Sequence, residues 1–154
     1  MKAGEVHAWV VALEEHESPA RDLGRYLQDD EVVRASRFRF AADRQRWTIG
    51  RVALRQILAH YCGCTPDNVF FRLGKNGKPF LAYPENDPAI HFNLSHSGAL
   101  PVIGVTHVGR FGIAVLANRN IAVREPDAMN IEHLANSQRI DNALVKPGDF
   151  GRAA

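Results

Sequence analysis

One long amphipathic segment most constrains how this chain of 154 residues folds. Within residues 43–61, apolar side chains and one glycine recur at spacings of three and four, which places them on a single face of an α-helix. These positions are Trp47, Gly50, Leu54, Ile57, Leu58 and Tyr61. Gly63 follows as a stop signal for the helix. Such a helix has to bury its apolar stripe against another layer of structure.

The charge around this helix is concentrated in arginine, with seven arginines and a single acid in residues 34–55. At about 100° per residue, Arg44, Arg51 and Arg55 are predicted on the face opposite the apolar stripe. Arg46 is predicted beside the stripe, where its charge lies at the edge of the core and needs an anionic partner. The group suits a phosphorylated small molecule or nucleic acid, and a solvated helix face is the alternative.

The other segments have the pattern of β-strands. Residues 6–13 predict a buried strand, and residues 69–73 and 91–94 predict two shorter ones. Residues 102–106 and 111–117 have the pattern of a hairpin. The predicted fold class is therefore α+β, with a mainly antiparallel sheet packed on the long helix.

Local signals predict one turn and two further helices. Residues 75–79 form a tight turn with Asn76 and Gly77 at its centre. Ser18 and Pro19 are an N-cap and a first helical residue, from which a short helix runs towards Gln28. A weaker helical pattern covers residues 127–135, and the end of the chain has the composition of a frayed tail.

Composition excludes several classes of protein. The formal net charge of +2 is too small to argue for nucleic-acid binding, and no aromatic-basic recognition motif supports it. No apolar run reaches the length of a membrane span and no secretory signal opens the chain, so we expect a cytoplasmic protein. The two cysteines, Cys62 and Cys64, are too few for a disulfide framework or a closed zinc site.

Residues 92–98, with the sequence Phe-Asn-Leu-Ser-His-Ser-Gly, carry the most distinctive chemistry. A strand is predicted to end there in small polar residues whose backbone amides are free to meet an anion. His96 can donate to a phosphate oxygen or relay a proton, and a polar turn with a surface histidine is the alternative. A serine hydrolase is disfavoured, because Ser95 and Ser97 lack the flanking glycines of a nucleophile elbow.

The turn at residues 77–79, Gly-Lys-Pro, is a second candidate site. Proline stiffens the exit of the turn, so Lys78 is held in place and can contact a phosphate as a point charge. The group Arg34, Arg37, Arg39, Arg44 and Arg46 is a third candidate, since guanidinium groups fork onto phosphates. An ordinary charged turn and a solvated face are the alternatives.

In order and spacing, these three features resemble the surfactin-synthetase-activating type of 4'-phosphopantetheinyl transferase, over roughly residues 5–125. The resemblance implies one half of a pseudo-dimeric fold. It also implies transfer of the phosphopantetheine arm of coenzyme A to a serine of an acyl or peptidyl carrier protein, with Mg²⁺ at the pyrophosphate. The coenzyme A-binding residues that it implies are Arg34, Arg46, Gly77, Lys78, Pro79, Ser95 and His96.

The resemblance also implies a role for each of these residues. Arg46, with Arg34, would hold the 3'-phosphate side of coenzyme A. Lys78, Ser95 and His96 would meet its phosphates, and His96 is the catalytic candidate. The glycine and proline of the turn would shape the wall near the adenine.

The sequence departs from the family at the metal ligands. The family pattern Gly-hydrophobic-Asp-hydrophobic-Glu is matched by Gly-Ile-Ala-Val-Leu at residues 112–116, so Ala114 and Leu116 stand where carboxylates are expected. Methyl and isobutyl groups cannot supply the oxygen ligands that Mg²⁺ requires. We therefore expect no metal site at these positions and impaired transfer.

The second departure concerns the second half of the family's fold. A Trp-x-x-Lys-Glu segment is not found, so residues 1–125 are predicted to form the transferase-like N-terminal subdomain and residues 126–154 a divergent tail, with the second subdomain absent. A natural remnant, a truncated chain and a non-catalytic module that binds coenzyme A or a carrier protein remain open as explanations. An exposed half-interface would favour self-association.

Overall fold

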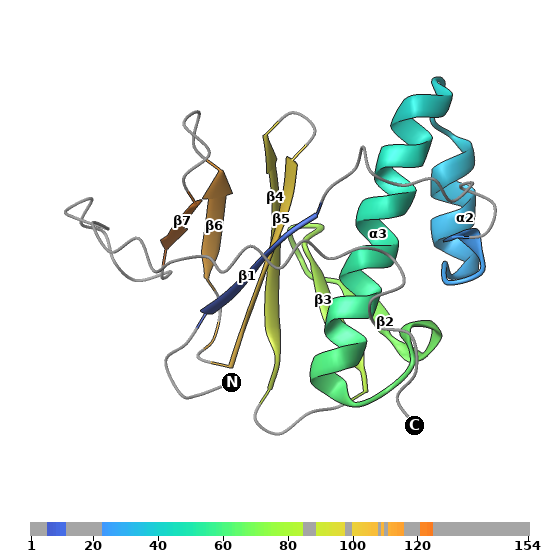
Figure 1. The fold of residues 1–154 in the computed structure, drawn as a ribbon. Coiled ribbons are helices and arrows are strands. Elements are labelled where there is room, and N and C mark those ends of the chain that lie inside the picture. The colour runs from blue at the N-terminus through green and yellow to red at the C-terminus, as the bar shows by residue number, and fades with distance from the viewer. Residues whose placement is uncertain are drawn as a thin grey trace.

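A computed structural model describes residues 6–11, 23–84, 89–97, 100–107, 109, 111–115 and 121–124. The elements along these residues are β1 (Val6–Val10), α2 (Asp29–Ser36), α3 (Ala41–Cys62), a 3₁₀ helix (Pro66–Asn68), β2 (Phe70–Leu73), β3 (Pro79–Tyr83), β4 (His91–Ser97), β5 (Leu100–Thr106), β6 (Gly112–Val115) and β7 (Ile121–Arg124). The α+β prediction is confirmed, with antiparallel sheets beside a long helix (Figure 1).

Helix α3 confirms the long amphipathic helix that was predicted within residues 43–61. It begins after Phe40 and ends at Gly63, whose φ of 65° is left-handed and whose N–H bonds the carbonyl oxygen of Ala59. Its centre is the middle of the main core, with Ile49, Leu54 and other apolar residues fully buried. None of the helices that the structure describes is long and apolar enough to cross a membrane.

The central sheet has the strand order β1-β5-β4, and both pairings are antiparallel. Successive residues of β5 point to opposite faces of the sheet, as expected for a strand, and so pack in two different hydrophobic cores. Ile103 and Val105 pack with α3 in the main core, whereas Val102 packs on the opposite face with Phe111 and Ile113. On that second face, a Cβ on Gly104 would lie 2.6 Å from a ring carbon of Phe111, so only glycine fits there.

Strands β2 and β3 form a hairpin around the predicted Asn-Gly turn, with Leu73 opposite Pro79. Gly77 has a φ of 71°, which glycine adopts without strain, and Gly74 N–H bonds the carbonyl oxygen of Lys78. The hairpin packs on the core through Phe71, whose ring lies 5.5 Å from that of Phe92. The turn therefore has a fixed position beside the core.

The predicted hairpin of residues 102–106 with residues 111–117 is wrong. Strand β5 already pairs with β1 on one side and β4 on the other, so no edge is left for the next strand. Strand β6 pairs instead with β7, with Gly112 opposite Arg124. The predicted buried strand at residues 6–13 is shorter, and β1 is half-buried along its length.

Helix α2 was not predicted, although its first turn holds Asp29, Asp30 and Glu31, which favour a helix N-terminus. Leu23 and Gly24 are helical and a turn follows them, but the predicted start of that helix at Ser18 lies outside the described residues. The weak helix predicted at residues 127–135 and the predicted tail also lie outside them.

Candidate functional site

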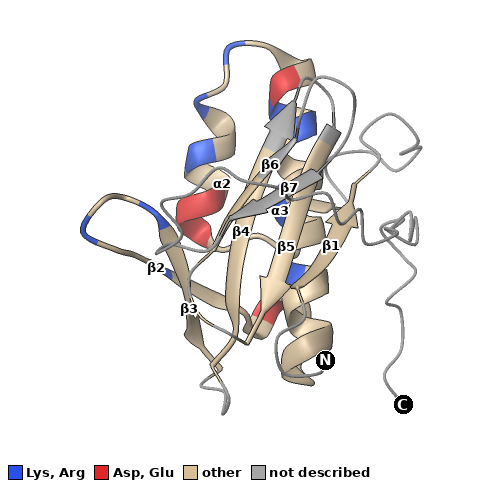
Figure 2. Cartoon of the chain, turned by 90° about the vertical axis from the view of Figure 1, so that its left-hand side faces the viewer, with Lys and Arg blue, Asp and Glu red and all other residues tan. Residues whose placement is uncertain are grey.

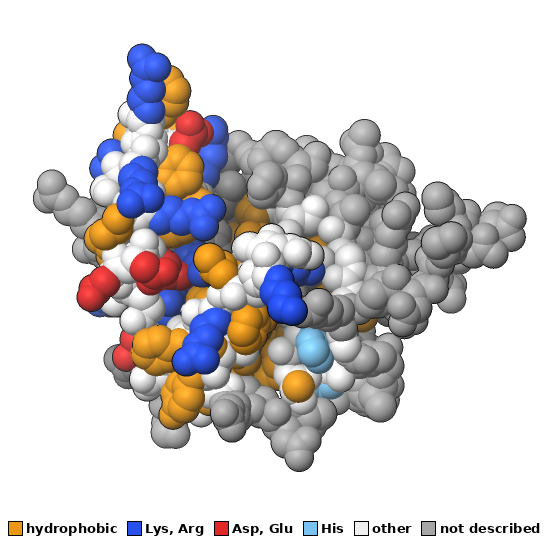
Figure 3. All heavy atoms as spheres, turned by 180° about the vertical axis from the view of Figure 1, so that it is seen from behind, with side chains coloured by type: hydrophobic (Ala, Val, Ile, Leu, Met, Phe, Trp, Pro, Cys, Tyr) orange, Lys and Arg blue, Asp and Glu red, His pale blue; other side chains and the backbone are white. Residues whose placement is uncertain are grey.

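A groove of about 800 Å³ lies between α2, α3, the β2–β3 turn and β4. Five of the predicted site residues line it: Arg34, Arg46, Gly77, Lys78 and Pro79. They come from α2, α3 and the turn, and the first and last of them, Arg34 and Pro79, are 45 positions apart in the sequence. Lys and Arg gather on α2, α3 and the turn (Figure 2), and basic side chains alternate with apolar ones on this face of the molecule (Figure 3).

The walls of the groove are apolar below and cationic at the rim. Trp47, Leu54 and Phe92 are among its apolar lining residues. The guanidinium carbon of Arg34 lies 5.8 Å from the centre of the Trp47 ring, so α2 and α3 are joined across the groove by a cation–π contact. The groove thus offers a flat apolar surface next to positive charge, a combination that suits a nucleotide.

Arg46 differs from its predicted environment. We expected its charge at the edge of the core, but its side chain is 54% exposed and lies 3.5 Å from the carboxylate of Asp43, one turn earlier in α3. Solvent and Asp43 therefore satisfy this guanidinium without a core environment. It remains part of the groove's lining.

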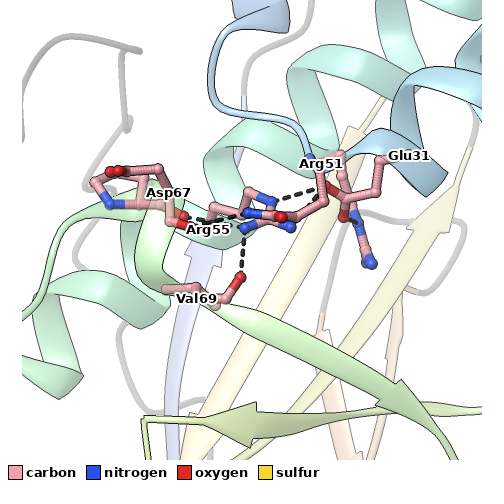
Figure 4. Close-up of polar contacts among 7 residues, drawn as sticks. Glu31, Arg51, Arg55, Asp67 and Val69 are labelled. Atoms are coloured by element: carbon pink, nitrogen blue, oxygen red, sulfur yellow. Dashed lines mark hydrogen bonds and ion pairs between the residues drawn. The ribbon is translucent and has the colours of Figure 1, made fainter.

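Arg51 and Arg55 do not fit the solvated helix face that was the alternative for the arginine group. Both bond Glu31 of α2 from neighbouring turns of α3 (Figure 4). The side chains of Glu31 and Arg55 are 3% and 1% exposed, and that of Arg51 is 18% exposed. The physical reason is that α2 and the β2–β3 hairpin cover the flank of α3, so its buried surface is wider than the apolar stripe alone.

The donors of Arg55 are satisfied by three acceptors. Its Nε donates to Oε2 of Glu31 at 2.8 Å, and Nη1 donates to the backbone carbonyl oxygens of Pro66, at 3.1 Å, and of Val69. Glu31 Oε2 also accepts the backbone N–H of Gln28 at 2.9 Å. Burial lowers the pKa of Arg55, while the charge of Glu31 opposes this shift, so Glu31 is the counter-charge that compensates the buried guanidinium.

The Phe-Asn-Leu-Ser-His-Ser run is placed differently from its prediction. It continues β4 to Ser97 and pairs with β5, with Ser95 opposite Val102, so its backbone is not a free loop. Ser95 is half-buried and is not among the residues that line the groove, although Asn93 and Leu94 beside it are. The side chain of His96 lies outside the described part of the chain, so its predicted role stays a prediction.

Arg51, Asn93 and Leu94 are groove residues that the sequence prediction did not assign. Arg51 follows Trp47 by four residues, so both lie on one side of the helix, and this spacing was a usable signal. Nothing in the sequence of α2 pointed to a partner for Arg51, because Glu31 reaches it only through the packing of α2 on α3.

A family model described as 4'-phosphopantetheinyl transferase, N-terminal, matches residues 14–108, which is more than half of the chain. The chain belongs to the 4'-phosphopantetheinyl transferase family. The predicted resemblance is thereby confirmed. The groove lies within the matched part, because its lining runs from Arg34 to Pro101.

Individual members of the family are similar over part of their length. The chain is 41% identical to the 4'-phosphopantetheinyl transferase HetI of Nostoc over 109 residues, which cover 71% of this chain and 46% of HetI. It is 37% identical to a phosphopantetheinyl transferase of Thraustochytrium over 97 residues, which cover 60% of this chain and 33% of that protein. It is 36% identical to psf-1 of Bacillus pumilus over 93 residues, 60% of this chain and 38% of psf-1. The chain thus matches between a third and about half the length of these phosphopantetheinyl transferases.

Phosphopantetheinyl transferases use coenzyme A and Mg²⁺. Among the described residues, no group of three or more His, Cys, Asp or Glu is arranged to hold a metal ion. Position 114 of β6 carries an alanine, whose methyl group is no ligand for a hard cation, and Leu116 lies outside the described residues.

Proposed function

We propose that the groove binds coenzyme A through its phosphates and its adenine, as the nucleotide-binding half of a 4'-phosphopantetheinyl transferase. One observation carries this proposal: Arg34, Arg46 and Lys78 line a single groove together with the Gly77 and Pro79 of the rigid turn. These are five of the seven residues that the family resemblance assigned to coenzyme A.

The proposed contacts follow from the chemistry of the lining. Arg34 and Arg46 line the groove together with Trp47 and would bind the 3'-phosphate, since guanidinium groups fork onto phosphate oxygens. Lys78 would meet the phosphates from the opposite wall as a point charge. The apolar lining beside them would receive the adenine.

For the transfer itself, we propose the acceptor that the family implies, a serine of an acyl or peptidyl carrier protein. The serine oxygen bonds the phosphorus that carries the pantetheine arm, the bond from that phosphorus to the bridging oxygen breaks, and 3',5'-ADP leaves. Ser95 and His96 are proposed to contact the phosphates, and His96 is also proposed to relay the proton released by the serine of the carrier protein.

Impaired transfer by this chain is part of the proposal. The residues at positions 114 and 116 offer no carboxylate, so no step is assigned to a metal held there. We propose that residues 1–125 form the transferase-like subdomain and that residues 126–154 diverge from it. Binding without catalysis, to coenzyme A or to a carrier protein, is the alternative, and Ala114 is the observation that favours it.

The test combines binding and transfer on one preparation. Calorimetry with coenzyme A is expected to show salt-sensitive binding, because charge-assisted contacts at an exposed groove are screened. Incubation with coenzyme A, Mg²⁺ and apo carrier proteins, followed by intact mass, is expected to show little or no gain of the phosphopantetheine mass. Absence of coenzyme A binding contradicts the proposed function, and rapid modification of a carrier contradicts the proposed impairment.

A further inference from the structure

Arg51 occupies a position in the groove that differs from that of the other cations. It lines the groove from α3, yet its side chain is only 18% exposed, against 54% for Arg46. Its Nε donates to Oε1 of Glu31, and its guanidinium carbon lies 4.2 Å from the centre of the Phe71 ring. The head group is therefore fixed by α2 on one side and by β2 on another.

The two terminal nitrogens of Arg51 are left for another partner. Within the described ranges, neither of them hydrogen-bonds a protein group, since the contacts of Arg51 are those with Glu31 and Phe71. Four of the five N–H donors of an arginine are carried by these nitrogens, and they form the fork that matches a phosphate. A half-buried guanidinium with an unused fork beside a groove is preorganised for an anion.

The local charge balance points the same way. Glu31 is the one carboxylate bonded to both guanidinium groups, and its Oε2 is already occupied by Arg55 and by the N–H of Gln28. Asp30 also acts on Arg55 from α2 but does not bond either arginine among the described residues. The cluster of Glu31, Arg51 and Arg55 thus carries an excess positive charge next to the groove.

We propose that Arg51 is an anion-binding residue of the groove, which contacts a phosphate of the ligand with its terminal nitrogens while Glu31 positions its guanidinium. The ligand class is a phosphate ester or anhydride. Its identity as coenzyme A rests on the proposed function. Because Arg51 is less exposed than Arg46, its contact is screened less by water and salt, and it contributes more to affinity.

The experiment is calorimetry with two probes, coenzyme A and inorganic pyrophosphate, on the whole chain. Arg51→Met removes the charge and keeps most of the stem. Arg44→Met is the matched control, because Arg44 lies on the same helix, is exposed and does not line the groove. We expect Arg51→Met to weaken binding by about tenfold or more relative to Arg44→Met, the loss expected for a charge-assisted contact.

The two probes separate this inference from the proposed function. If coenzyme A binds and the two variants bind it equally, the role of Arg51 is refuted and the proposed function stands. If only pyrophosphate binds, and Arg51→Met weakens it, the role of Arg51 stands and the proposed function fails. If the unaltered chain binds neither probe, both are refuted.

Two further variants cover folding and the role of Glu31. If Arg51→Met does not fold, Arg51→Lys is compared with Arg44→Lys. Because lysine lacks the fork of arginine, we expect Arg51→Lys to bind about threefold or more weakly than Arg44→Lys. Equal affinity of these two variants refutes the role of Arg51. Glu31→Asp shortens the side chain by one methylene group and so moves the carboxylate away from Arg51. This change should weaken binding only in a chain that still has Arg51. An equal effect of Glu31→Asp in the Arg51→Met background shows a purely structural role for Glu31.

Discussion

Glu31 and Arg55 form an ion pair that is almost completely withdrawn from solvent, with Nη2 of Arg55 2.7 Å from Oε2 of Glu31. The pair joins α2 to the middle of α3. Arg55 extends the connection to the backbone before β2 through the carbonyl oxygens of Pro66 and Val69. Three parts of the groove's frame therefore depend on one carboxylate.

Glu31→Gln is expected to destabilise the fold by about 3–5 kcal/mol, because it leaves Arg55 charged and buried without its counter-charge. Urea unfolding followed by circular dichroism measures this change. Asp29→Asn, in the same turn of α2, is the control and should change the free energy of unfolding by less than about 1 kcal/mol. Equal losses for the two variants would contradict the role assigned to the buried pair.

Gly104→Ala is expected to destabilise the fold by about 1–3 kcal/mol, because its Cβ overlaps the Phe111 ring on the second face of the sheet. Phe111→Leu in the same chain should restore part of that loss, since it removes the ring atoms that clash. Gly50→Ala is the matched control: among the described residues, no atom apart from the neighbouring backbone of α3 itself lies within 4 Å of a Cβ there, so the change should stabilise α3 by roughly 0.5–1 kcal/mol. A harmless Gly104→Ala would show that Phe111 does not pack on Gly104.

Tyr61 provides a prediction for alkaline pH. Its hydroxyl accepts a hydrogen bond from Nε1 of Trp9 at 3.1 Å, and burial raises its pKa above 10.0 although that hydrogen bond opposes the shift. The folded state thus holds the proton more tightly than the unfolded state. Its contribution to stability is present below a pH of about 10 and is lost as the pH rises through the folded pKa. The free energy of unfolding should fall more steeply in this range for the unaltered chain than for Tyr61→Phe, and equal slopes would refute the assignment.

How much of this architecture could be predicted depended on how local each signal was. Helix α3, its end at Gly63 and the Asn-Gly turn follow from residues close in sequence, and they were predicted correctly. The pairing of β6 with β7 was missed, because it depends on β1 returning to occupy an edge of β5. The sequence pattern of a hairpin reflects only residues close together in the chain. It therefore does not show that a distant strand such as β1 already occupies the edge of β5.

The groove shows the same division. The Gly-Lys-Pro turn and Arg46 could be identified from the sequence, because the family resemblance assigned them and the chain brings them together. The burial of Arg55 could not, since it results from α2 and the hairpin packing on a flank that periodicity alone marks as solvated. A charged residue is predicted outside unless its partner is known.

Self-association is a further prediction. The hairpin exposes Phe70, Phe80 and Tyr83, which are 40%, 46% and 55% accessible, so large apolar side chains are open to solvent on this part of the molecule. Exposed apolar surface of this kind drives association. Sedimentation velocity is expected to show dimers or larger species, and Phe80→Ser should shift the distribution towards monomer. A monomer at high concentration would refute the prediction.

The central claim is that the groove's cations bind the phosphates of coenzyme A. The most direct test is calorimetry with coenzyme A on the double variant Arg46→Met, Lys78→Met, against the control pair Arg44→Met, Lys75→Met. The control removes the same charge from α3 and the same turn, but neither of its residues lines the groove. We predict that the first pair weakens binding by about tenfold or more and lowers its dependence on salt, while the control binds nearly as the unaltered chain does. Equal affinity of the two double variants would contradict the claim.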